Sequence, residues 1–178
     1  MSKKIKMIYN IEAIDVLLNE DLILQRYYPL ISYKKILLEK FKENKILTNY
    51  DCLDKGHNIL LECLGSVELL NLFNRFLTMY EIEENKLKIV DCLKISKEEK
   101  EAYKELFLLP GVKETRANLY YLSGYKCLLD FINCNEEEII KNMNYTIKKY
   151  NLDCKAALPK EVKTHIAVAK TYSLYSYK

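Results

Sequence analysis

The chain has 178 residues, of which 49% are apolar and 11% aromatic, with 4 glycines, 3 prolines and no tryptophan. This length predicts one compact domain, or one with a small appendage, and the apolar fraction argues against a disordered chain. Because so few turn-forming residues argue against a sandwich or barrel of many hairpins, we predict an all-α, multi-helix fold. The formal net charge of +3 is too small to indicate a nucleic-acid or membrane partner by itself.

Charges are balanced over most of the chain. Residues 1–96 carry 14 basic and 14 acidic side chains, and residues 97–150 carry 9 of each, whereas residues 151–178 carry 5 basic and 2 acidic ones. No apolar run approaches the ~20 residues of a membrane span, and the N-terminal residues do not read as a signal peptide. The six cysteines form no CxxC pair, which predicts free thiols in a reducing cytoplasm and no metal site.

Apolar residues of the first half recur at helical spacing. The predicted helices cover residues 8–24, 33–45, 57–64 and 67–80. Gly65 is suited to a C-terminal stop, and Ser66 is suited to cap the helix that follows. Residues 49–56 are predicted as a loop. Residues 81–95 are predicted as a connector, because their alternating stretch has no evident partner strand.

Helix signals are sharper in the second half. Ser96 and Glu99 form a capping box, which predicts a helix from Lys97 to about Leu108. The dipeptide Pro110-Gly111 ends that helix. The helices predicted after it cover residues 113–123, 126–133, 136–150 and 159 onward, with Gly124 and Asn135 as stop and cap.

The functional signal lies between the first two of these helices. The segment reads Leu108-Leu109-Pro110-Gly111-Val112-Lys113-Glu114-Thr115-Arg116-Ala117-Asn118-Leu119. It resembles a helix-hairpin-helix motif, whose usual form is Leu-Pro-Gly, an apolar residue, a second glycine, variable residues, a small residue and leucine. Lys113 stands at the position of the second glycine. With the glycine turn and capped acidic helix that follow, residues 105–150 resemble the helix-hairpin-helix domains of the bacterial families called DUF4332 and pathogenicity-locus proteins.

The resemblance implies a SAM-like helical module. We therefore divide the chain into an N-terminal helical region (1–95), the helix-hairpin-helix module (96–150) and a C-terminal basic helix and tail (151–178). The resemblance also implies weak, sequence-independent binding to the backbone of DNA or another nucleic acid. In such a motif the unpaired N–H groups and the dipole at the start of the second helix hold a phosphate. The implied phosphate-binding residues are Gly111, Val112, Lys113, Thr115 and Arg116.

Two further expectations concern other roles. Lys160, Lys163 and Lys170, with the tyrosines that follow them, form either a second nucleic-acid contact or an ordinary C-terminal helix. The same hairpin also serves as a protein-interaction or scaffold module without nucleic-acid binding, and this alternative stays open. Neither histidine, His57 or His165, falls in a catalytic or metal-binding pattern, so we expect a protein that is not an enzyme, needs no cofactor and has no catalytic residues.

Overall fold

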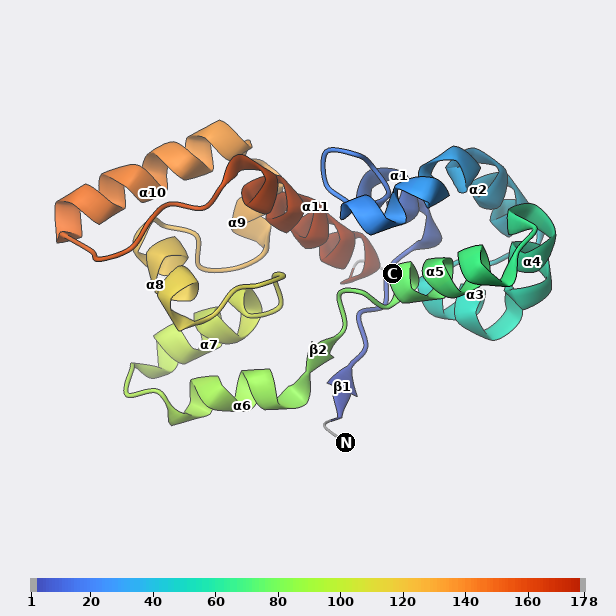
Figure 1. Cartoon of the computed structure of the whole chain (residues 1–178). Coiled ribbons are helices and arrows are strands. Elements are labelled where there is room, and N and C mark those ends of the chain that lie inside the picture. The colour runs from blue at the N-terminus through green and yellow to red at the C-terminus, as the bar shows by residue number, and fades with distance from the viewer. Residues whose placement is uncertain (1–2, 177–178) are drawn as a thin grey trace. The chain divides into compact units, whose positions relative to one another are not determined.

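The structure is a computed structural model that describes residues 3–176. Helices dominate this part of the chain, which confirms the predicted all-α, multi-helix fold (Figure 1). Its one small sheet consists of β1 (Lys4–Ile5) and β2 (Ile82–Glu83), which pair antiparallel with Ile5 opposite Ile82. No helix of the described residues is long and apolar enough to cross a membrane.

The chain folds as two compact units, and each is described by itself. The first unit contains residues 3–5 and 82–173, and the second contains residues 6–81 with residues 174–176. The boundary predicted after residue 95 therefore falls inside the first unit. Residues 151–173 belong to the same unit as the hairpin, because side chains of the last helix bond to it, rather than forming a separate tail.

The second unit is built from short helices. Its elements are η1 (Ile11–Ala13), α1 (Ile14–Leu17), η2 (Gln25–Tyr33), α2 (Lys34–Glu43), α3 (Asn49–Lys55), α4 (His57–Leu64) and α5 (Val67–Leu77). Phe73 lies at its centre, with ring centroids 6.2 Å from Phe41 and 5.7 Å from Phe76. As predicted, Gly65 ends α4 in the left-handed conformation, and the Ser66 hydroxyl accepts from a first-turn N–H of α5.

A buried asparagine joins distant segments of this unit. Asn49 is fully buried, and its carboxamide oxygen accepts from the Tyr9 N–H at 3.0 Å. Its NH₂ group donates to the carbonyl oxygens of Met7 at 2.9 Å and Leu77 at 3.2 Å. Three segments that lie far apart in the sequence are thus held by one side chain.

Two predictions for this unit are wrong. The single helix predicted over residues 8–24 is in fact η1 and α1, which end at Leu17, because the backbone near Ile11 pairs with Leu47 and the Asn19 side chain caps a turn. The loop predicted over residues 49–56 is α3. The Thr48 hydroxyl accepts from the Asp51 N–H, and the Asp51 carboxylate accepts in return, forming a capping box.

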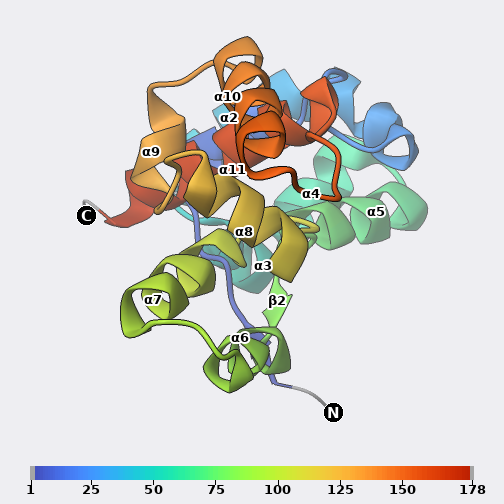
Figure 2. The same cartoon turned by 90° about the vertical axis from the view of Figure 1, so that its left-hand side faces the viewer.

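The first unit carries the longer helices. After β2 its elements are α6 (Glu84–Cys92), α7 (Lys97–Leu106), α8 (Glu114–Leu122), α9 (Leu129–Ile132), α10 (Glu136–Tyr150) and residues 159–173 of α11 (Pro159–Ser176). Helix α8 lies between α7 and α10 and packs against both (Figures 1 and 2). Most of residues 81–95, which were predicted as a connector, form the helix α6 instead. The rings of Tyr120, Tyr125 and Phe131 pack together in the core.

Capping explains where these helices begin and end. The predicted box is present: the Ser96 hydroxyl accepts from the Glu99 N–H at 3.1 Å, and the Glu99 carboxylate accepts from the Ser96 N–H at 2.9 Å. Asn135 caps α10, and Gly124 follows α8 with a φ of +96°. Helix α9 is shorter than predicted because the Asp130 carboxylate accepts from the N–H groups of residues 126 and 127, which holds them in a turn.

Candidate nucleic-acid interface

A tight turn joins α7 to α8 and carries the predicted phosphate-binding residues. Gly111 has a φ of +73°, in the left-handed region that favours glycine. A Cβ atom added there would meet nothing within 4 Å, so the backbone conformation, and not a lack of space, calls for glycine. Val112 is fully buried, and its N–H donates to the carbonyl oxygen of Leu109 at 3.3 Å. Val112 therefore fixes the turn and has no N–H to offer a ligand.

The turn leaves the start of α8 open. Lys113 is its N-cap residue with an extended backbone, and no side chain caps the helix there. The first-turn N–H groups of Glu114, Thr115 and Arg116 consequently have no acceptor within the helix. The side chains of residues 113–115 are exposed. Together with the positive end of the helix dipole, these groups can accept one anion.

A second lysine lies beside this turn. Lys86, on α6, is half-buried, and its ammonium group donates to the carbonyl oxygen of Phe107 at 3.0 Å. Burial, together with the positive charge of Lys113, lowers the pKa of Lys86. Within residues 3–176, neither lysine has a carboxylate within 4.0 Å. Two ammonium groups without a carboxylate partner thus lie near the turn, and an anion beside them would reduce their mutual repulsion.

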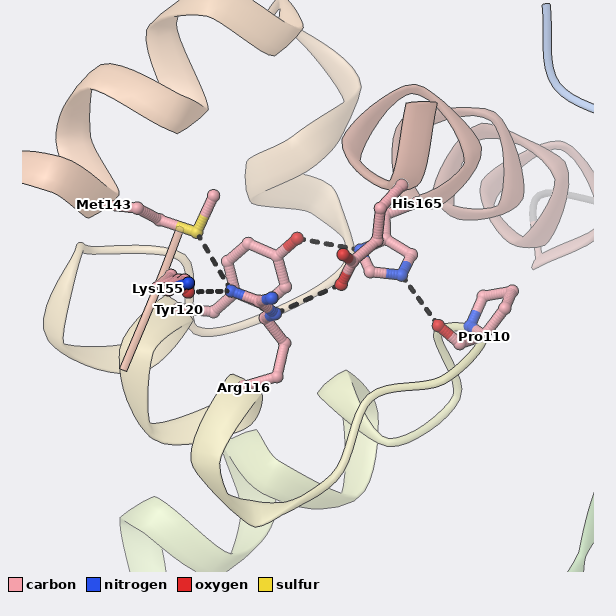
Figure 3. A network of polar contacts seen from close by, with 7 residues as sticks. Pro110, Arg116, Tyr120, Met143, Lys155 and His165 are labelled. Atoms are coloured by element: carbon pink, nitrogen blue, oxygen red, sulfur yellow. Dashed lines mark hydrogen bonds and ion pairs between the residues drawn. The ribbon is translucent and has the colours of Figure 1, made fainter. Parts of the chain in front are cut away.

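Arg116 makes contacts within the first unit. Its Nε donates to the Glu161 carboxylate at 3.1 Å, and its Nη1 donates to the carbonyl oxygen of Lys155 at 3.0 Å (Figure 3). The side chain is only 21% exposed. Through its Nε and Nη1 donors, Arg116 joins α8 to Lys155 and to Glu161 of α11.

His165 fixes the turn from α11. Its Nε2 lies 2.8 Å from the carbonyl oxygen of Pro110, and its Nδ1 lies 2.8 Å from the Tyr120 hydroxyl (Figure 3). A carbonyl only accepts, so Nε2 carries the hydrogen and Nδ1 accepts from Tyr120. Burial lowers the pKa of His165, which favours this neutral form. Sequence spacing did not reveal this contact, since the partners are 45 and 55 residues away.

A pocket beside the start of α8 is acidic. A pocket of about 390 Å³ is lined by residues that include Glu99, Glu114, Thr115 and Asp153. Thr115, predicted as a phosphate donor, therefore lies beside three carboxylates. These carboxylates repel a phosphate from this pocket.

The three lysines predicted as a second nucleic-acid contact lie in different environments. Lys163 pairs with the Glu136 carboxylate of α10 at 3.5 Å, so its charge is partly neutralised. Lys160 and Lys170 are exposed on α11. The structure brings Lys163 into the first unit's own ion pairs and does not gather the three lysines around the hairpin turn.

The described residues contain no metal-binding cluster and no disulfide. No group of three histidine, cysteine or acidic side chains could hold a metal ion between residues 3 and 176. All six cysteines lie in this range and are free. In the comparisons with known proteins, no family model, no curated protein and no solved structure matches the chain. The resemblance of residues 105–150 therefore rests on their sequence pattern alone.

Proposed function

We propose that the protein is a non-enzymatic nucleic-acid-binding module that holds one backbone phosphate at the start of α8. The observation that carries the proposal is that Lys86 and Lys113, neither of which has a carboxylate partner, lie beside the open first turn of that helix. Phosphate contacts of this kind position a strand without reading its bases. The six free thiols are consistent with the reducing cytoplasm as the place where this occurs.

Each residue of the turn has a defined part in this proposal. Gly111 and Val112 set the backbone, Lys113 and Lys86 supply positive charge, and the first-turn N–H groups donate to the phosphate oxygens. Glu114 opposes the interaction. The binding is weak, because residues 97–150, which contain the turn, carry nine basic and nine acidic side chains and so supply no wider attractive field.

A protein-interaction or scaffold role is the second candidate. The observation that favours it is that Arg116 and His165 direct their polar groups into the unit, while carboxylates line the pocket beside Thr115. A hairpin whose polar side chains bond within its own unit serves as a packing element. The two candidates differ in whether Lys113 contributes to affinity for nucleic acid.

The deciding experiment is fluorescence anisotropy of labelled single-stranded, duplex and branched DNA at low salt. Lys113→Glu should weaken all three interactions, and Lys113→Ala should lower the slope of log K against log salt by about 1. Lys94→Glu is the matched control, since Lys94 is an exposed lysine of the same unit away from the turn. Undiminished affinity in the Lys113 variants, or no binding by the unaltered protein, contradicts the proposal and favours the protein-interaction role.

A further inference from the structure

The second half of α10 carries a surface unlike the rest of the first unit. We define the tyrosine-lysine surface by its five residues: Lys141, Tyr145, Lys148, Lys149 and Tyr150. Tyr145 is 66% exposed and Tyr150 is 48% exposed. The Lys149 ammonium lies 5.9 Å from the centre of the Tyr145 ring and 5.2 Å from that of Tyr150. Two exposed rings thus flank one positive charge.

Helical spacing explains why these side chains gather. Residues 141, 145, 148 and 149 recur at intervals of three and four, so they share one face of α10, and residue 150 closes the helix beside them. The opposite face carries Ile139, Met143 and Thr146, which are buried in the unit. The tyrosine-lysine surface is therefore directed away from the core.

The charge of this surface is of one sign. From residue 139 to residue 152 the chain has three lysines and no acidic residue. Within residues 3–176, none of these three lysines has a carboxylate within 4.0 Å. The surface thus offers unneutralised positive charge next to exposed aromatic rings, whereas the hairpin turn offers charge without exposed rings.

We propose that the tyrosine-lysine surface binds single-stranded nucleic acid, with bases stacked on Tyr145 and Tyr150 and phosphates held by Lys141, Lys148 and Lys149. An aromatic face accepts any unpaired base, and lysines attract the backbone without reading sequence. The bases of a duplex are already stacked on one another and are not available to such rings. This inference deepens the proposed function, on which it rests, by naming single strands as the substrate class.

Charge and composition select this occupant over others. The five residues of the tyrosine-lysine surface include three lysines and no acidic side chain, so the surface favours an anionic occupant. An anionic strand of bases matches both of its components. The rings match the bases, and the ammonium groups match the phosphates.

Fluorescence anisotropy with a labelled 12-nucleotide oligothymidine and a labelled duplex of the same length tests the inference. The double variant Tyr145→Ala/Tyr150→Ala should bind the single strand at least about 5-fold more weakly and leave duplex affinity unchanged. Tyr145→Phe/Tyr150→Phe should retain full affinity, because phenylalanine keeps the ring. Tyr28→Ala, which removes an exposed tyrosine of the second unit, is the matched control. Circular dichroism verifies that each variant is folded.

The outcomes separate this inference from the proposed function. If the tyrosine variant loses affinity for the single strand and Lys113→Ala has no effect, the result supports binding at the tyrosine-lysine surface and contradicts phosphate binding at the hairpin turn. The reverse pattern supports phosphate binding at the hairpin turn and overturns the inference that the tyrosine-lysine surface binds single strands. Equal losses for single strand and duplex, failure of the phenylalanine variant, or no binding of the single strand at low salt also overturn the inference.

Discussion

His165 and Pro110 lie 55 residues apart in the chain, and the imidazole Nε2 donates a 2.8 Å hydrogen bond to the Pro110 carbonyl oxygen. The turn between α7 and α8 is therefore fixed by a side chain of α11. A hairpin that resembles a self-contained motif depends here on a helix that begins at Pro159. The conformation of the candidate phosphate site therefore depends on the packing of the last helix against the turn.

Replacing His165 with alanine should destabilise the first unit. The change leaves the Pro110 carbonyl and the Tyr120 hydroxyl without their partner in a buried setting, which costs about 2–4 kcal/mol of unfolding free energy. Urea denaturation measures the loss, and hydrogen exchange at residues 108–113 locates it. His57→Ala, an exposed histidine of the second unit, is the control, and equal effects of the two substitutions would contradict the assigned role.

Acid should weaken the same contact. The pKa of folded His165 lies below its ordinary value of 6.5 because of burial, so the unfolded chain binds the proton more readily. The contribution is complete above about pH 6.5 and is lost as the pH falls from there through the folded pKa, with a slope of at most about 1.4 kcal/mol per pH unit. Thermal unfolding at pH 7.5, 6.5 and 5.5 measures it. The slope in this window should flatten in His165→Gln.

Arg116 and Lys113 should separate stability from binding. Arg116→Met removes an ion pair and a hydrogen bond to a backbone carbonyl, and should cost about 1–3 kcal/mol of unfolding free energy without changing nucleic-acid affinity in the folded protein. Lys113→Ala, at an exposed position, should leave stability within about 0.5 kcal/mol and lower affinity. Denaturation and anisotropy on both variants provide the comparison. A reversed pattern would return Arg116 to the phosphate site.

Asn49 should be the most sensitive polar residue of the second unit. Asn49→Ala removes three hydrogen bonds and leaves the Tyr9 N–H and two carbonyl groups without that partner, which should cost more than about 3 kcal/mol. Urea denaturation measures the change. Asn58→Ala, an exposed asparagine of α4, is the control and should be nearly neutral.

Local signals predicted much of the fold. The capping box at Ser96, the cap at Asn135 and the left-handed glycines at Gly65 and Gly124 are settled by a few neighbouring residues, and the structure confirms them. The predictions that failed depend on distant partners. The backbone near Ile11 bonds to Leu47, so the helix expected over residues 8–24 does not form as one piece.

The candidate site was only partly accessible to sequence reasoning. The Leu-Pro-Gly pattern placed the turn and Lys113 correctly at the start of α8. Lys86 was missed because it lies in the segment predicted as a connector, and the ion pair of Arg116 was missed because Glu161, its partner, lies 45 residues further on. The spacing of residues along one helix does not predict which side chains of another helix will contact that helix.

The pairing of β1 with β2 also bears on how the chain is made. Ile5 and Ile82 lie opposite each other, so residues 6–81 leave and rejoin the first unit at neighbouring points. During synthesis the ribosome releases the opening strand of the first unit, then nearly the whole second unit, before the strand's partner exists. The second unit can therefore fold while the first waits for its C-terminal half, and domains released in this order generally fold as they emerge. Closure of the hairpin comes last, when His165 leaves the ribosome.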